Sequence, residues 1–365
     1  MKKCIFPPGN FIRFIVLASA LSCILNENMY IAPMNQEKST QELLFQVIKQ
    51  RLPSNLSFVH DISDLLGISY DSAYRRIRGE KELSMEEIRT ICRHYNVSLD
   101  SLMGVENNSV VFTSMAIGQK NFTLAIWLGT ILEEVKKIKE CREKEVIYAA
   151  KDIPVFHLFQ FPEIAAFKFY FWHKALFPTR EDEDMLFSID ITEDVYAIGY
   201  QLLSIYNTIP VVELWNEETF MSVTRQIEYC YVSGFFASKA DALNLCDVLE
   251  KLVRHLQREA ERGFLFMYGS PEEGIPNNYR LYFNEVLLSD NTIYTCMDGN
   301  ANTYMTYNII NLLITGNPAF CDQIQNNLRI LMTKSTLISG TSAKERNRFF
   351  HLMQEKIKAL RARIE

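Results

Sequence analysis

Apolar residues between positions 41 and 103 recur at the three- and four-residue spacing of short amphipathic helices. The stripes predict five helices, over residues 43–52, 58–66, 69–78, 84–95 and 97–103. Pro53 ends the first helix, and Gly67 supplies the left-handed turn after the second. Five helices in so short a segment predict a small all-α domain over residues 41–104.

Capping residues fix the ends of the third and fourth helices. Ser69 is a good N-cap for the third helix, and Gly79 follows its end. Ser84 caps the fourth, and Glu87 stands three residues later as in a capping box.

The rest of the chain mixes both periodicities. Residues 105–118 are expected to form a linker into a long helix, 121–145. Strands are expected at 146–150 and 154–159, and helices at 163–176, 193–206, 218–233 and 239–262. Three strands of an antiparallel sheet, 279–288, 292–299 and 303–314, then precede helices 319–333 and 343–363. The chain is therefore predicted to be mainly α, a five-helix domain followed by a larger α+β domain over residues 119–365.

Composition agrees with two folded domains, because 48% of the 365 residues are hydrophobic. The net charge of −6 excludes a protein coated in positive charge. Binding to nucleic acid would therefore require a local basic patch.

The eight cysteines are scattered, with no CxxC pair and no histidine at ligand spacing. We expect most of them to be small buried hydrophobes in a reducing compartment. The chain has no phosphate-binding glycine loop, GxSxG or HExxH, so neither an enzyme nor a cofactor or metal is expected. The acidic run 181–184 is expected to be a solvated loop, and His157 a hydrogen-bonded core residue.

Two helices of the second domain allow more than one interpretation. The helix "FKFYFWHKALF", residues 167–177, is rich in aromatic residues, which favours core packing but also suits a ligand pocket or dimer interface. The basic closing helix, 343–363, suits a surface helix, a partner helix or DNA.

Residues 1–40 are expected to form an N-terminal extension. A basic start, an apolar run over residues 11–25 and the sequence "ALSC" resemble a signal peptide. Arg13 interrupts this run, which is shorter than the roughly 20 residues of a spanning helix. We favour a translation start at Met34, where a polar helix entry begins, over an export or membrane signal and over an ordered extension.

Residues 41–103 resemble the Cro/C1-type (XRE-like) helix-turn-helix domain of phage repressors and bacterial regulators. The resemblance rests on "ISDLLGIS" at 62–69, on Gly79 ten residues after Ser69, and on the ending "VSLDSLM". Ser63 stands where the family has a small residue, four before the turn glycine. A BetR-type N-terminal domain also fits.

The resemblance implies that the third helix reads the major groove of double-stranded DNA. Tyr70, Asp71, Tyr74 and Arg75 occupy the family's base-facing positions, and Arg76, Arg78 and Lys81 would contact phosphates. The full set of expected DNA-binding residues is Ser69, Tyr70, Asp71, Ser72, Tyr74, Arg75, Arg76, Arg78 and Lys81.

One position departs from the family pattern. An apolar residue often stands where this chain has Arg76, and Ile77, four after Ala73, is the nearest apolar candidate for burial. We therefore expect the helix face to be rotated by one residue.

These observations predict a cytoplasmic transcriptional regulator without stable membrane association. Its second domain would dimerise, sense an effector, or both, with helices 167–177 and 343–363 as the candidate dimer surfaces. The alternative is an interaction protein whose helical domain docks a protein or membrane partner through an N-terminal anchor. An ordinary solvated turn remains the alternative interpretation of "RRIRGEK".

The translation start is directly testable. Intact-mass measurement on the endogenous protein should give a chain that begins at or near Met34, because a DNA-reading domain has no use outside the cytoplasm. A membrane-fraction protein that begins at Met1, or carries lipid on Cys23, would contradict this expectation.

Overall fold

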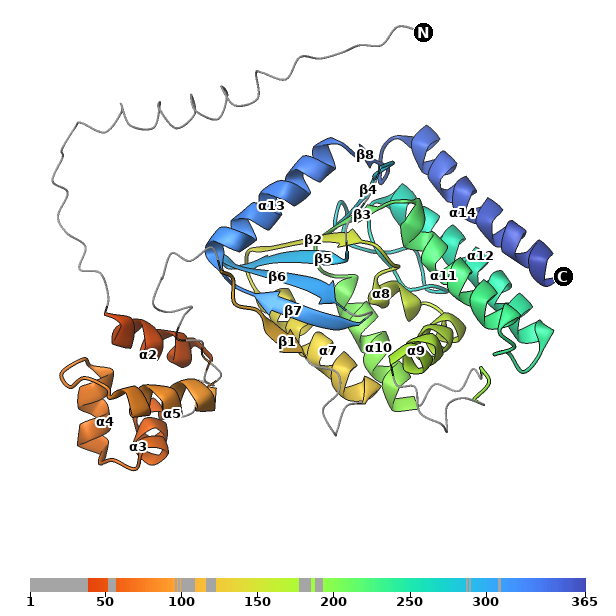
Figure 1. Ribbon diagram of the computed structural model, residues 1–365. Helices are drawn as coiled ribbons and strands as arrows, with labels where there is room; N and C mark the ends of the chain where they lie inside the picture. The colour runs from red at the N-terminus through yellow and green to blue at the C-terminus, as the bar shows by residue number, and fades with distance from the viewer. Residues whose placement is uncertain are drawn as a thin grey trace, which may run out of the picture. The chain divides into compact units, whose positions relative to one another are not determined.

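The computed structural model describes residues 39–51, 57–95, 97, 99, 109–115, 123–176, 185–187, 193–286, 288, 290–307 and 310–365. The chain divides into two compact units, Met1–Gly104 and Val105–Glu365. Figure 1 shows the first as helices only and the second as a sheet with helices on it, so the α+β class of the second unit is confirmed.

The first unit contains four described helices: α2 (Thr40–Arg51), α3 (Phe58–Leu66), α4 (Tyr70–Ile77) and α5 (Met85–Tyr95). Their apolar stripes meet in one small core, in which Ile48, Ile62, Ala73 and Ile91 are fully buried. The fifth expected helix and the acidic run 181–184 lie outside the described residues, apart from Val97 and Leu99.

The second unit is built on an eight-stranded mixed sheet, in the order β1-β7-β6-β5-β2-β3-β4-β8. Its strands are β1 (Thr113–Met115), β2 (Lys144–Ala150), β3 (Val211–Trp215), β4 (Tyr279–Phe283), β5 (Thr292–Met297), β6 (Asn300–Tyr307), β7 (Asn311–Thr315) and β8 (Thr336–Leu337). Its helices are α7 (Leu124–Glu140), α8 (Val155–Leu158), α9 (Pro162–Leu176), α10 (Glu193–Tyr206), α11 (Glu217–Val232), α12 (Lys239–Arg262), α13 (Pro318–Thr333) and α14 (Ala343–Ile364).

Both faces of the central strands are buried. Val146 and Tyr148 of β2 point into the large core formed with α7–α12 and α14. Ile147 and Ala149, which alternate with them, face α13 in a smaller core. This arrangement explains why β2 reads as a nearly continuous apolar run.

The sheet differs from the expected antiparallel one. β2, β3 and β4 run parallel, because helices connect each of them to the next, whereas β5, β6 and β7 are antiparallel as expected. β3, whose five buried residues include a glutamate, was not among the expected strands. The strand expected at 303–314 is in fact two strands, β6 and β7, and β1 pairs with β7 from within the expected linker.

The strand expected at residues 154–159 is wrong. Pro154 precedes a single helical turn, α8. Because Phe156, His157 and Leu158 are all buried, the sequence of this turn does not show the alternation of apolar and polar positions that marks an amphipathic helix. The long helix expected at 121–145 also ends earlier, at Glu140, where β2 follows.

The apolar surfaces of both candidate dimer helices are already packed. Phe167, Phe169, Tyr170 and Trp172 of α9 are buried in the large core. The apolar face of α14, including Phe350 and Leu360, packs on the same core. α9 is therefore an internal packing element, whereas α14 is a surface helix whose polar face is exposed.

Six cysteines fall within the described residues, and all are free. Cys230, Cys246 and Cys321 are buried, whereas the other three are half-buried, so the expectation of buried thiols holds for only half of them. No helix among the described residues is long and apolar enough to cross a membrane.

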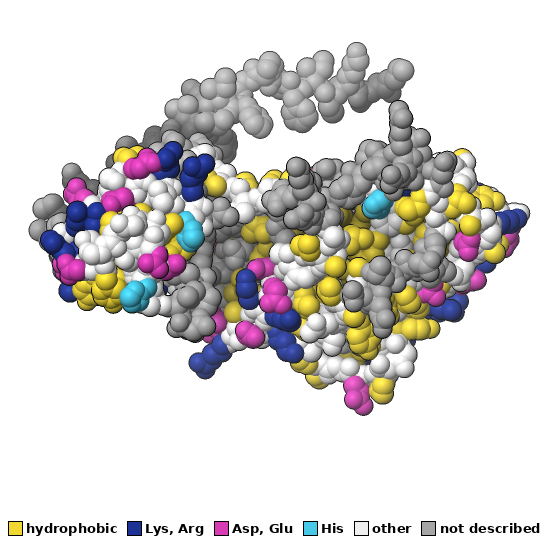
Figure 2. All heavy atoms as spheres, turned by 90° about the horizontal axis from the view of Figure 1, so that it is seen from below, with side chains coloured by type: hydrophobic (Ala, Val, Ile, Leu, Met, Phe, Trp, Pro, Cys, Tyr) yellow, Lys and Arg dark blue, Asp and Glu magenta, His cyan; other side chains and the backbone are white. Residues whose placement is uncertain are grey.

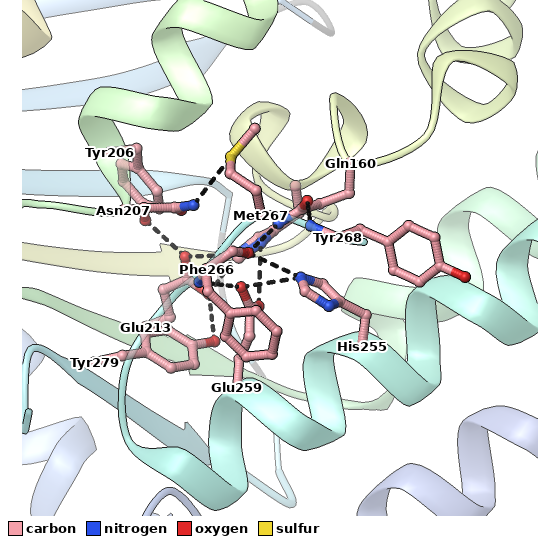
Figure 3. A network of polar contacts seen from close by, with 11 residues as sticks. Gln160, Tyr206, Asn207, Glu213, His255, Glu259, Phe266, Met267, Tyr268 and Tyr279 are labelled. Carbon is pink, nitrogen blue, oxygen red and sulfur yellow. Dashed lines mark hydrogen bonds and ion pairs between the residues drawn. The ribbon is translucent and has the colours of Figure 1, made fainter. Parts of the chain in front are cut away.

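A buried carboxylate ties the parallel strands to the helices (Figure 3). Glu213 of β3 accepts hydrogen bonds from Tyr206 (2.6 Å), Tyr279 (2.9 Å) and His157 Nε2 (3.0 Å). Burial alone would lower the pKa of His157, yet the Glu213 carboxylate holds it above the usual value. Burial would likewise raise the pKa of Glu213, but His157 and the two hydroxyls keep it low. Both shifts favour the ionised pair inside the core between about pH 4.5 and 6.5.

Glu213→Gln should destabilise the second unit by about 3–5 kcal/mol, because it leaves the buried His157 with only the more distant Glu259 carboxylate, 4.0 Å from its Nδ1. The raised His157 pKa stabilises the fold below about pH 6.5 and ceases to do so as pH rises through the folded value. The lowered Glu213 pKa stabilises it above about pH 4.5. The penalty should thus be largest between these values and shrink in alkali.

Urea unfolding followed by tryptophan fluorescence measures this penalty, since all three tryptophans, Trp127, Trp172 and Trp215, lie in the second unit. Glu218→Gln, which removes an exposed partner of Arg225, is the matched control and should change little. A Glu213→Gln penalty that does not vary with pH would contradict the ionised pair.

Candidate nucleic-acid interface

The turn between α3 and α4 is built from the residues that suggested it. Gly67 has a φ of 62°, which favours glycine, and its N–H donates to the Asp64 carbonyl. Ser63 Oγ donates to the Ile68 carbonyl at 2.6 Å, and the Ile68 N–H donates to the Ser63 carbonyl at 3.0 Å. The serine at position 63 is therefore small enough for the turn, and its hydroxyl also stabilises the turn through a hydrogen bond.

The predicted caps are confirmed at both following helices. Ser69 Oγ accepts from the Ser72 N–H at 3.3 Å at the start of α4. At α5, Ser84 Oγ accepts from the Glu87 N–H, and Glu87 Oε2 accepts from the Ser84 N–H at 2.8 Å. The start of α4 and the start of α5 are thus fixed by local hydrogen bonds.

One face of α4 is open to solvent and is both aromatic and cationic. Tyr70 and Tyr74 are 49% and 42% exposed, far above a core position. Asp71, Arg75 and Arg78 share this exposure, as does Lys81 in the following loop. The Arg78 guanidinium lies over the Tyr74 ring at 5.5 Å, and the Tyr70 ring packs beside His60. Ser69 is exposed at the start of this face, and Ser72 is half-buried.

Arg76 does not join this face, which corrects its assignment as a phosphate contact. It is only 6% exposed, and its guanidinium pairs with Glu87 at 2.8 Å and donates to the Ser72 carbonyl. Burial would raise the pKa of Glu87, but the Ser84 N–H and Arg76 hold it below its usual value.

The expected rotation of α4 is also absent. Ala73 and Arg76 are the buried residues of the helix, whereas Ile77 is only half-buried. Arg76 thus occupies the inward position where the family often has an apolar residue. The ion pair with Glu87 allows a charged residue there without turning the helix.

Gln41 is a positioning residue that the sequence analysis missed. Its Nε2 donates to the carbonyls of Arg76 (2.7 Å) and Lys81 (2.9 Å), and its Oε1 accepts from the Leu83 N–H (2.9 Å). A single side chain on α2 thereby fixes the loop after α4. No local pattern marks it, because its partners are at least 35 residues away.

Acidic groups moderate the positive charge of the interface. Glu80 lies 3.4 Å from Arg78 and 3.9 Å from Arg75, and all three side chains are about half exposed. Figure 2 shows the same intermixing of Lys or Arg with Asp or Glu over the helical unit. Such exposed pairs are weak and are readily exchanged for phosphate contacts. Among the described residues, no group of three or more His, Cys, Asp or Glu could hold a metal ion.

Arg76→Met should leave the first unit within about 1 kcal/mol of its original stability, because methionine fills the inward position without a charge to desolvate. Glu87→Ala should cost more, about 1–3 kcal/mol, since it leaves the buried Arg76 guanidinium without its carboxylate partner. Hydrogen–deuterium exchange of peptides from α4 and α5 measures both changes. The reverse order of the two penalties would show that Arg76 is not held inward in solution.

Comparison with known proteins agrees with this geometry. Residues 48–123 match the BetR domain, a helix-turn-helix DNA-binding family, over about a fifth of the chain. No curated protein and no solved structure matches the chain significantly. The match supports a DNA-binding regulatory role in general for this part of the chain.

Proposed function

We propose that the chain is a sequence-specific transcriptional regulator of the cytoplasm whose α4 lies in the major groove of double-stranded DNA. The observation that carries the proposal is the face of α4 itself. Its inward residues, Ala73 and Arg76, are packed, while Tyr70, Tyr74 and Arg75 are presented outward on a rigidly capped helix. Because this helix is already ordered in the free protein, DNA binding does not incur the conformational-entropy cost of folding it.

The exposed residues divide into two roles. Arg75 is the candidate for base readout, because a guanidinium binds guanine O6 and N7 in a bidentate manner. Tyr70 and Tyr74 offer apolar rings to thymine methyl groups. Arg78 and Lys81, at the end of α4 and beyond it, contact phosphates and set the register.

The second unit is proposed to make the regulator dimeric. One helix-turn-helix buries little surface on DNA, and Glu80 offsets part of its charge, so a single copy binds weakly. Two joined copies gain affinity through effective concentration and impose a half-site spacing of about one helical turn or a multiple of it. Because α9 and the apolar face of α14 are already packed, the contact uses another surface of the protein.

Arg75→Ala should cost about 1–3 kcal/mol at one base position and relax specificity there. Arg78→Ala and Lys81→Ala should weaken binding to all sequences alike and flatten the salt dependence. Quantitative binding to a selected site at several salt concentrations separates the two effects. Arg363→Ala, in the second unit, is the control and should change neither. Equal, sequence-independent losses for all three α4-region variants would reject the division of roles.

Light scattering on the full chain tests the dimer. The expected mass is twice the 42.4 kDa of one chain at micromolar concentration. A monomer that still binds a single half-site at nanomolar concentration would show that the second unit serves another purpose.

A further inference from the structure

The second unit contains an apolar cavity between α7 and the sheet. Its volume is about 130 Å³, and its walls come from α7, α8, α9, α10 and strands β2, β5, β6 and β7. An empty apolar cavity of roughly 150 Å³ is known to hold a molecule the size of benzene. The cavity therefore has the capacity for one small ring or an equivalent aliphatic group.

Six aromatic rings line this cavity together with Ile, Val and Leu side chains. The rings belong to Trp127, Tyr148, Phe156, Trp172, Tyr206 and Tyr304. Trp127 and Trp172 meet edge to face at 6.0 Å, and Phe156 stacks on Tyr206 at 3.8 Å. These rings pack against their own neighbours, so the walls are preformed and need little ordering when a ligand enters.

The charges around the cavity select against an anion. Among the described residues, its lining includes the carboxylates of Glu134 and Asp152 and no Lys, Arg or His. Lys168 Nζ lies near the Trp172 ring, but it already donates to Asp152 and to Gln226. An anionic ligand would therefore meet two carboxylates and, in the described part of the lining, no cation that is free to pair with it.

A cation is not required either, because both carboxylates have partners. Glu134 pairs with Lys137, and Asp152 accepts from Lys168 and Ser222. Two buried polar atoms of the described lining have no hydrogen-bond partner, Trp127 Nε1 and Thr295 Oγ1, on residues that are 6% and 2% exposed. A hydroxyl can donate or accept, whereas the indole N–H can only donate, so Trp127 Nε1 is the group that specifically needs an acceptor. A buried N–H without an acceptor is unfavourable, and an oxygen on a ligand would supply one.

We propose that this cavity binds an uncharged molecule with an apolar body of about one ring and a hydroxyl or carbonyl oxygen that accepts from Trp127 Nε1. The role of that molecule as the effector of a regulator rests on the proposed function above. The binding itself does not.

Four probes of similar size test the proposal on the full chain. Benzyl alcohol and toluene are neutral and differ in the oxygen acceptor, whereas benzoate is an anion and benzylammonium a cation. Isothermal titration or ligand-observed NMR should show saturable, one-to-one binding of benzyl alcohol at about millimolar concentration. Toluene should bind about three- to tenfold more weakly, because it lacks the acceptor. Benzoate and benzylammonium should bind at least about tenfold more weakly, since each takes a charge into an apolar site.

Two matched tryptophan variants assign the site. Trp127→Phe keeps a ring but removes the donor, so the affinity for benzyl alcohol should fall to the affinity for toluene. Trp215→Phe is the control, because Trp215 is also buried with an unpartnered Nε1 but does not line the cavity. It should leave the preference for benzyl alcohol unchanged. Val146→Phe, which places a ring in the cavity, should abolish binding of all four probes.

Several results would overturn the proposal: no saturable binding, benzoate or benzylammonium as tight as benzyl alcohol, or an unchanged preference in Trp127→Phe. If Val146→Phe does not fold, the two tryptophan variants still decide. The binding assay contains no DNA, so its outcome is independent of the proposed function. A protein that binds the probes but not DNA would reject only the proposed function. A protein that binds DNA but not the probes would reject only the cavity ligand.

Discussion

Burial of Arg76 in α4 depends on its ion pair with Glu87. Arg76 takes an inward position in which a lone charge would be costly, and Glu87, already committed to the cap of α5, neutralises it. One carboxylate therefore joins the start of α5 to the last turn of α4 and allows a charged side chain on the inward face. Gln41 fixes the loop that follows. These buried contacts hold the helix that presents Tyr70, Tyr74 and Arg75 outward, so the interface is supported from inside the unit.

The second unit uses a similar device at larger scale. Glu213 lies on the central strand β3 and gathers groups from α8, α10 and β4 around one carboxylate (Figure 3). Behind it, His255 and Glu259 of α12 bind the chain at Phe266. Tyr206 belongs both to this network and to the wall of the apolar cavity, and Phe156 of the cavity precedes His157 of the network. A ligand in the cavity would therefore contact Tyr206 and Phe156, which are connected to the Glu213 network. Ligand binding could change the conformation of the second unit through these contacts.

The sequence predicts features whose cause is local and misses those whose cause is distant. Gly67, Ser69 and the Ser84–Glu87 box act within a few residues, and the structure confirms each of them. Arg76 and Gln41 were misassigned or missed because their partners lie 11 and at least 35 residues away. In the second unit, β3 carries a buried glutamate that breaks its apolar pattern, and only Tyr206, Tyr279 and His157 make that glutamate acceptable. Parallel pairing of β2, β3 and β4 likewise follows from helical connections that no single strand reveals.

The central claim is that the outward face of α4 reads a base sequence. Selection of bound fragments from genomic DNA by the purified full chain, followed by sequencing, tests it most directly. We expect an enriched motif with two related half-sites about one helical turn or a multiple apart, and the loss of preference at one position of each half-site when Arg75→Ala protein is used. Fragments that match the genomic background, or a motif unchanged by Arg75→Ala, would contradict it.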